Sequence, residues 1–120
     1  SLLAVADTIT RALKAVTEDG TAKRLKGAKC SVAGKTGTSF GTYANGKYVD
    51  EHGRRKYQGT FVGFFPAEDP QYSIISVVYS KPTNKSFQGG GIPAKAIRTV
   101  IDRVYDIDPY FQETLRQKRK

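Results

Sequence analysis

At 120 residues the chain is about one domain long, and its 38% hydrophobic and 26% charged residues are typical of a globular protein, which excludes a disordered segment. The formal charge of +9 suggests an anionic partner, but no basic stretch is interleaved with aromatic residues as in RNA-binding sheets, so we expect no nucleic acid. No apolar run approaches the roughly 18 residues of a membrane span. Part of the charge lies in a basic tail, 116–120, which we expect to be solvated and separate from a domain over 1–115.

The beginning of the chain has the spacing of an amphipathic helix. Apolar residues recur there at three- and four-residue intervals, at Leu2, Val5, Ile9, Leu13 and Val16. Gly20 is suited to end this helix. Because the chain contains no methionine and opens at Ser1 inside the helical pattern, we expect it to be part of a longer protein.

Three strands are expected next, at residues 29–38, 57–65 and 71–80. Residues 39–58, between the first two strands, are polar and rich in turn formers, and Asn45-Gly46 is a hairpin signal. The third strand carries apolar residues on both faces, so we expect it to be covered on both sides.

A second helix is expected near the end of the chain. Pro93 suits its first turn, and one face is lined by Ala94, Ile97, Ile101 and Val104. The order helix, three antiparallel strands, helix predicts an α+β fold in which helices pack on an antiparallel β-sheet. The core should include Phe61, Phe64 and Phe65 of the second strand.

Other reactive groups have simple interpretations. Cys30 lies in an apolar stretch and is expected to be a small buried hydrophobic residue. His52 neighbours Asp50 and Glu51, but adjacent loop residues rarely converge on an ion, so neither a metal site nor a cofactor is expected. The glycines at 89–91 could hold an anion before the last helix, although a flexible loop is the simpler interpretation.

The stretch Val32–Gly41, VAGKTGTSFG, carries the strongest signal. Gly34-Lys35-Thr36 matches the end of a phosphate-binding P-loop, which also requires a glycine where this chain has Lys29. The residues that follow do not predict a helix whose N-terminus could face a phosphate. A nucleotide site is therefore not expected.

An acyl-transfer site fits the same residues better. Thr36 and Thr38, two apart on a strand, point to the same side and can hold a carboxylate. Gly37 between them lets an acyl substrate lie close to the strand, and Lys35 supplies positive charge. The backbone N–H of Thr38 can face a developing oxyanion, a contact typically worth about 10²–10³ in rate.

The surroundings of this motif resemble the C-terminal part of the penicillin-binding proteins, from about residue 8 to about 105. The similarity is greatest to class B transpeptidases of the cell-division type. It is carried by AVTEDGTAKRL (15–25), VAGKTGTS (32–39), FVGFFPAEDPQYSIISVVYSKP (61–82) and GGGIPAKAIRTVIDRVYD (89–106). The resemblance implies a fragment of the serine β-lactamase/penicillin-binding transpeptidase fold.

For the site, the resemblance implies that Lys35 acts electrostatically and helps to organise a hydroxyl network. It also implies that Thr36 and Thr38 bind the carboxylate of a D-Ala-D-Ala stem or a β-lactam, with Gly37 between them and the Thr38 amide as half of an oxyanion hole. The family's nucleophile is absent, because none of the seven serines is followed by lysine three residues on or asparagine two residues on. Tyr43-Ala44-Asn45 imitates the family's second motif, but it follows Lys-Thr-Gly and is expected to be a hairpin turn.

The implied parent is a serine D,D-transpeptidase that cross-links peptidoglycan stem peptides and is a target of β-lactams. The resemblance also implies an inner-membrane anchor on an absent N-terminal segment, an extracytoplasmic (periplasmic) catalytic domain and cell-division membrane partners. The 120 residues alone are expected to be inactive without the missing N-terminal half of the domain, since an acyl-enzyme needs an activated hydroxyl. A non-catalytic binding or structural module stays open, and a nucleic-acid-binding module with steeply salt-dependent affinity ranks third.

Overall fold

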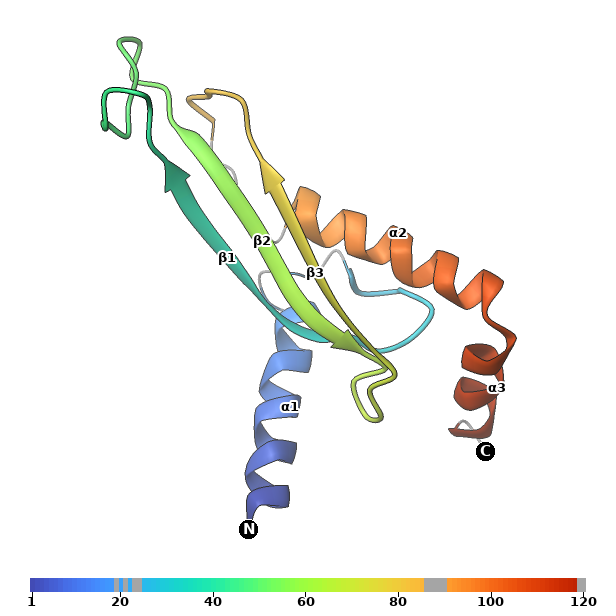
Figure 1. Ribbon diagram of the computed structural model, residues 1–120. Coiled ribbons are helices and arrows are strands. Elements are labelled where there is room, and N and C mark those ends of the chain that lie inside the picture. The colour runs from blue at the N-terminus through green and yellow to red at the C-terminus, as the bar shows by residue number, and fades with distance from the viewer. Residues whose placement is uncertain (19, 21, 23–24, 86–90, 119–120) are drawn as a thin grey trace.

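The computed structural model of the chain describes residues 1–18, 20, 22, 25–85 and 91–118. Its elements in chain order are α1 (Leu2–Glu18), β1 (Ala33–Gly41), β2 (Lys56–Phe65), β3 (Tyr72–Tyr79), α2 (Ile92–Ile107) and α3 (Pro109–Lys118). Figure 1 shows the strands as one long twisted sheet, with α1 and α3 near one end and the β1–β2 connection at the other. The predicted α+β architecture is confirmed, and α3 is an additional helix.

The sheet is antiparallel, with the strand order β1-β2-β3. Thr36 lies opposite Phe61 and Phe40 lies opposite Tyr57. Because side chains alternate along a strand, Thr36, Thr38 and Phe40 share one face of the sheet with Phe61, and we call it the core face. The opposite face, here called the open face, carries Lys35 and its cross-strand neighbour Val62.

The core lies between the core face and α2. Phe61 and Phe65 from β2 meet Ile97 and Ile101 from α2, and all four side chains are almost completely buried. The predicted apolar face of the last helix is therefore confirmed, with Ala94 also buried and Val104 packed against the cluster. Burial of this kind of side chain typically contributes about 1.5–3 kcal/mol each, so this contact stabilises the sheet against α2.

Two glycines make room for the largest core side chain. Gly34 and Gly63 lie opposite each other on β1 and β2, and the Phe61 ring lies across both. A methyl group at Gly34 would lie 2.5 Å from the carbonyl oxygen of Val62, and one at Gly63 would lie 2.6 Å from that of Ala33. Since backbone atoms cannot move aside easily, both positions need glycine.

Asp108 joins α2 to α3, and its side chain caps the N-terminus of α3. Its Oδ1 accepts hydrogen bonds from the amides of Tyr110 (3.0 Å) and Phe111 (3.2 Å), and its Oδ2 accepts one from the Tyr72 hydroxyl. The Tyr72 hydrogen bond, followed by the amide of Phe111, lowers the pKa of the Asp108 carboxyl. The Phe111 ring packs edge-on against Phe65 (5.9 Å between centroids) and Tyr72 (5.6 Å). Together these contacts fix α3 against the end of the sheet.

Several sequence-based boundaries need correction. β1 covers Ala33–Gly41, so it begins later and ends later than the predicted 29–38. The first three residues of the predicted basic tail 116–120 belong to α3, and the last two lie outside the described residues. Phe64 is half-buried and not fully in the core, because its position in the alternation is on the open face.

The prediction that β3 is covered on both sides is wrong for the described chain. On the open face Ile75 is 64% exposed and Tyr79 is 72% exposed, since none of the described elements lies over them. The first half of α1 is similarly uncovered, with Leu2 and Leu3 more than four-fifths exposed. The helix itself is confirmed, and its last turns reach the core through Val16. Among the described helices, none combines the length and apolarity of a membrane span.

Candidate active site

The residues Lys35 to Thr38 lie in the middle of β1, which is an edge strand among the strands described. Lys35, Gly37 and Thr38 are exposed, and Thr36 is half-buried. The alternation of the strand places Thr36 and Thr38 on the core face and Lys35 on the open face. The four predicted residues are thus brought together at an accessible edge, with two hydroxyls on the same side.

Gly37 differs sharply from Gly34 three residues before it. The nearest atom to a methyl group at Gly37 would be the Cβ of Thr60, at 4.0 Å, which is an ordinary van der Waals distance. The described positive-φ glycines are Gly27, Gly46 and Gly53, so the backbone at Gly37 does not demand glycine either. Neither packing nor conformation explains the residue, and its effect is to leave the surface of the edge strand open.

The ammonium group of Lys35 stays close to its own strand. Its Nζ donates a hydrogen bond of 3.0 Å to the carbonyl oxygen of Thr36. This contact holds a positive charge against the backbone of β1 at Thr36, where it can attract an anionic ligand to the edge of the strand.

Ser31 is the described serine that most resembles a nucleophile with a base. Its hydroxyl donates to a carboxylate oxygen of Glu68 and accepts from the amide of Ala67 (3.1 Å), while Lys14 donates to the other oxygen of Glu68. Burial alone would raise the pKa of Glu68, but the hydrogen bonds from Lys14 and Ser31 outweigh it and the pKa is lowered. A carboxylate with a lowered pKa is a poor general base near neutral pH. The arrangement therefore ties α1 to the β2–β3 turn and does not supply the missing nucleophile.

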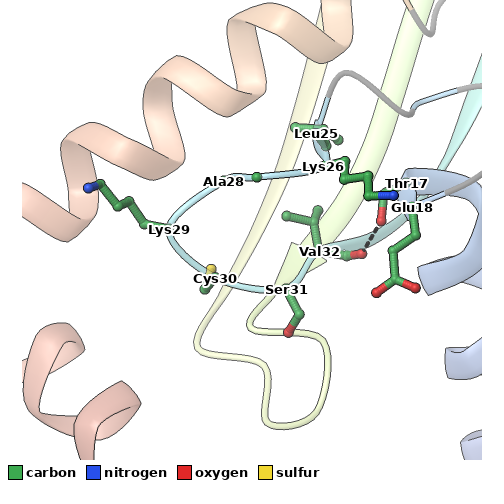
Figure 2. A pocket seen from close by; sticks show the side chains of 10 residues that line it. Thr17, Glu18, Leu25, Lys26, Ala28, Lys29, Cys30, Ser31 and Val32 are labelled. Carbon is green, nitrogen blue, oxygen red and sulfur yellow. Dashed lines mark hydrogen bonds between the residues drawn. The ribbon is translucent and has the colours of Figure 1, made fainter.

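A pocket of about 400 Å³ lies before β1, between the end of α1 and the loop 25–32. Figure 2 shows the side chains around it and the hydrogen bond of 2.6 Å that Thr17 donates to the carbonyl oxygen of Val32. Cys30 lines this pocket and is half-buried, and burial raises the pKa of its thiol to about 12. A thiol that stays protonated is not a nucleophile at neutral pH, which agrees with the predicted structural role.

The segment between β1 and β2 consists of two tight turns. Gly46 (φ 78°) in the first turn and Gly53 (φ 74°) in the second adopt the left-handed conformation that favours glycine. In the first turn, which is the predicted hairpin turn, the Tyr43 amide donates a hydrogen bond of 2.8 Å to the carbonyl oxygen of Lys47. Tyr43-Ala44-Asn45 is therefore part of a turn, as predicted. The second turn is closed by Asp50, whose carboxylate accepts hydrogen bonds of 2.8–2.9 Å from the amides of His52 and Arg54 and from the Arg54 side chain.

The His52 side chain is exposed, and its Nε2 lies 3.5 Å from a carboxylate oxygen of Glu51. The part of the chain that the structure describes contains no group of three or more histidine, cysteine or acidic side chains arranged for a metal ion. Of the predicted glycine loop at 89–91, the first two residues lie outside the described residues. Gly91 is the N-cap residue of α2.

The fold and the edge motif together define a class of protein. A Lys-Thr-Gly strand in an antiparallel sheet with packed helices is typical of the serine β-lactamase/penicillin-binding fold. The family model of the penicillin-binding protein transpeptidase domain matches residues 4–102. The chain therefore belongs to this family, as the sequence resemblance indicated.

Similar proteins support the same assignment. The chain is 37% identical over 70 residues to the probable peptidoglycan D,D-transpeptidase PenA of Neisseria flavescens, which covers 58% of this chain and 16% of that protein. It is 34% identical over 76 residues to a peptidoglycan D,D-transpeptidase FtsI homolog of Chlorokybus atmophyticus, and this match covers 63% of this chain and 10% of that protein. The solved transpeptidase domain of the FtsI4 D,D-transpeptidase from Legionella pneumophila matches with a TM-score of 0.59 and 29% identity, over 82% of this chain and 34% of that one. The chain thus spans a minor part of each of these proteins.

Proposed function

We propose that the chain supplies the substrate-binding strand of a serine-type peptidoglycan D,D-transpeptidase. The observation that carries the proposal is the geometry of β1, where Thr36 and Thr38 lie on one face of an exposed edge strand. Gly37 separates them without being required by the fold. An edge strand of this shape suits an extended peptide that lies alongside it.

In the proposed complex, the hydroxyls of Thr36 and Thr38 donate hydrogen bonds to the terminal carboxylate of a D-Ala-D-Ala stem peptide or to the carboxylate of a β-lactam. The ammonium of Lys35 adds a favourable charge next to this carboxylate. The amide of Thr38 donates to the oxyanion that develops as the acyl carbon is attacked. These three contributions bind and polarise the substrate, and the nucleophile comes from another part of the protein.

The proposed reaction has two steps. A serine oxygen attacks the carbonyl carbon of the penultimate D-Ala, the bond from this carbon to the terminal D-Ala nitrogen breaks, and that nitrogen takes up the proton lost by the serine. The amine of a neighbouring stem peptide then attacks the acyl-enzyme, loses a proton and forms the cross-link, while the serine oxygen regains a proton. Lys35 and Thr38 contribute to both steps because each step passes through an oxyanion at the same carbon.

The surfaces that the described chain leaves uncovered suit the remaining part of a transpeptidase domain. Leu2 and Leu3 on α1, and Ile75 and Tyr79 on β3, are large exposed apolar side chains. Patches of this kind usually mark an interface. We infer that the rest of the domain covers them and supplies the serine, so that the 120 residues alone are inactive. We also propose, from the same resemblance, that the whole protein lies on the periplasmic side of the inner membrane with an N-terminal anchor and cell-division partners.

The alternative is a non-catalytic binding or structural module derived from the same fold. It stays open because the 120 residues contain neither Ser-x-x-Lys nor Ser-x-Asn. The full-length sequence separates the two cases: both motifs ahead of β1, in that order, indicate an enzyme, and their absence indicates a module that only binds.

Covalent labelling tests the proposal directly. The 120-residue chain and the full-length protein are incubated with a fluorescent penicillin, and the masses of both are measured. We expect a stable adduct on the full-length protein alone. An adduct on the short chain would contradict the mechanism, because a serine within it would then be reactive. If neither protein reacts, the catalytic proposal is wrong and the non-catalytic module is favoured.

The threonine pair is tested by Thr36→Val and Thr38→Val in the full-length protein. Hydrogen bonds to a charged group contribute about 1.5–3 kcal/mol, so each variant should be acylated about 10- to 150-fold more slowly. Thr99→Val, at an exposed position on α2, is the matched control and should react at the wild-type rate.

A further inference from the structure

The pocket between the end of α1 and the loop 25–32 lies outside the candidate active site, and we call it the loop pocket. Its volume of about 400 Å³ is within the roughly 300–1,000 Å³ of small-molecule sites. Its described lining residues come from the end of α1 and from residues 25–32, and β1 begins only at Ala33. A ligand in the loop pocket would therefore leave the substrate-binding strand accessible.

The loop that surrounds the loop pocket is fixed by contacts with three other segments. On the α1 side, the Thr17 hydroxyl donates a hydrogen bond of 2.6 Å to the carbonyl oxygen of Val32 (Figure 2). On the α2 side, the Lys29 amide donates one of 3.0 Å to the carboxylate of Asp102. The carbonyl oxygen of Ser31 accepts one of 3.1 Å from the β2–β3 turn. Because the loop is held in this way, the pocket is largely formed before a ligand arrives, which reduces the entropy lost on binding.

The floor of the loop pocket is apolar. Leu25 and Val32 line it, and both belong to the buried core. Ala28 and Cys30 also line it, are half-buried and pack against the same core. Figure 2 shows the Val32 side chain pointing into the space between the two arms of the loop. This floor is small and continuous with the core, so it suits a short hydrocarbon group.

The rim of the loop pocket carries three exposed charged side chains, Lys26, Lys29 and Glu18. The ammonium of Lys29 is directed to α2, where it lies 5.6 Å from the centre of the Tyr105 ring. The carboxylate of Glu18 lies 3.8 Å from the ammonium of Lys14 on its own helix. Lys26 extends toward the end of α1 (Figure 2) and forms no ion pair with any other described side chain. Lys26 is therefore the cation that a bound anion would meet.

We propose that the loop pocket binds a small organic monoanion, a carboxylic acid with a short aliphatic or aromatic body. Its carboxylate accepts a hydrogen bond from Lys26, and its body lies on Leu25 and Val32. A single charge is specified because one ammonium suits one acidic group, and a second negative charge on the ligand would face Glu18 across the rim. The inference goes beyond the function proposed above, since it involves neither β1 nor a nucleophile.

The test compares two probes of nearly equal shape that differ in charge, 3-phenylpropionate and its neutral amide, 3-phenylpropanamide. The dissociation constant of each probe for the full-length protein is measured from the broadening of the probe's proton NMR signals during a titration. We expect 3-phenylpropionate to bind at least about 5-fold more tightly than the amide, which is the effect of a charge-assisted hydrogen bond at a partly exposed site.

Three lysine variants locate the site. Lys26→Gln should bring the ratio of the two dissociation constants close to one. Lys29→Gln is the matched control, because it makes the same change on the same rim, and it should keep the ratio since Lys29 is directed to α2. Lys35→Gln separates the loop pocket from the substrate-binding strand, which also attracts carboxylates, and it should keep the ratio too. A thermal unfolding midpoint equal to that of the wild type shows that each variant is folded.

Equal dissociation constants for the two probes on the wild-type protein overturn the loop pocket as an anion site. So does a preference that survives in Lys26→Gln, or one that Lys26→Gln and Lys29→Gln weaken equally, because net charge would then be its cause. A preference that is lost in Lys35→Gln places the anion at β1 and also overturns the proposal. Labelling by penicillin reports on the proposed function separately, because binding of the probes requires no acyl transfer.

Discussion

Replacing Gly37 by alanine should separate the fold of β1 from its chemistry. The new methyl group would lie 4.0 Å from the Cβ of Thr60, so it fits without a clash. Gly37 also lacks the positive φ that would oppose a side chain. At such a position alanine restricts the unfolded chain and typically raises the free energy of unfolding by about 0.4–1 kcal/mol. The variant should therefore be at least as stable as the wild type.

The same methyl group should be harmful to catalysis. By the strand alternation this methyl group lies on the open face, as Lys35 does, and it would displace a peptide or β-lactam that lies along the edge of β1; a displacement of about 1 Å can cost about 10²-fold in rate. We expect Gly37→Ala in the full-length protein to be acylated about 10²-fold more slowly. The assay follows labelling by a fluorescent penicillin over time, beside a thermal unfolding curve for each protein.

Gly34→Ala is the matched comparison, because the same change is made three residues away on the same strand. Its methyl group would lie 2.5 Å from the carbonyl oxygen of Val62 and would meet the Phe61 ring. Overpacking of this kind costs about 1–3 kcal/mol, and each kcal/mol lowers the unfolding midpoint by about 2–8 °C. If Gly37→Ala lowers the midpoint as much as Gly34→Ala, the packing argument is refuted. If Gly37→Ala is acylated at the wild-type rate, the substrate does not lie against this strand.

Three further predictions concern titrating and reactive groups. The hydrogen bond from Tyr72 lowers the pKa of Asp108, so its stabilisation is complete above the ordinary carboxyl pKa and is lost as the pH falls through the lowered value. Between pH 7 and 3 the urea midpoint of the wild type should thus fall more steeply than that of Asp108→Asn, and equal slopes would contradict the assignment. Burial raises the pKa of Cys30 to about 12, so iodoacetamide at pH 8 should modify it only on unfolding; labelling of the native protein at the rate of a free thiol would argue against this. Glu68→Gln should weaken its pairing with Lys14, and hydrogen exchange in α1 should become faster, whereas unchanged exchange would show that the pair does not hold the helix.

Much of the fold follows from the sequence because pattern and packing agree. The spacing of apolar residues in α2 matches the side chains that the core buries, and Gly46 takes the positive φ that its turn signal predicts. The Lys-Thr-Gly triplet alone is a weak signal, and it was recognisable through the sequence that surrounds it. The strand alternation then places Thr36 and Thr38 together.

The differences have physical reasons too. Ser39, Phe40 and Gly41 look like the start of a loop, but pairing of Phe40 with Tyr57 across the strands extends β1 to Gly41. α3 was not predicted, although an Asp-Pro pair at its start is a helix signal that could have revealed it. The apolar open face of β3 was expected to be covered, but Ile75 and Tyr79 are exposed there, because apolar residues on a strand do not specify which segment packs over them.

A pocket of about 530 Å³, lined by Phe40, Lys47, Tyr48, Val49 and Arg55, could not have been predicted from the sequence. Its lining comes from the end of β1, the first turn of the β1–β2 connection and Arg55, so it exists only after the strands pair. In the sequence, Lys47 and Arg55 are ordinary loop cations, and Phe40 is an isolated aromatic residue. The signal that was present is the group of aromatic and basic residues that follows Thr38, within a segment otherwise rich in turn formers.

The Phe61 ring across Gly34 and Gly63 has a consequence for where the threonine pair can be. If β1 slid by two residues along β2, Thr36 would face Gly63, and its side chain would occupy the space of the ring. If it slid by one residue, the hydroxyls would turn to the open face. Gly34 and Gly63, with the Phe61 ring across them, therefore favour the observed register of β1 against β2. Through it, an apolar contact in the core determines the position of Thr36 and Thr38 at the edge.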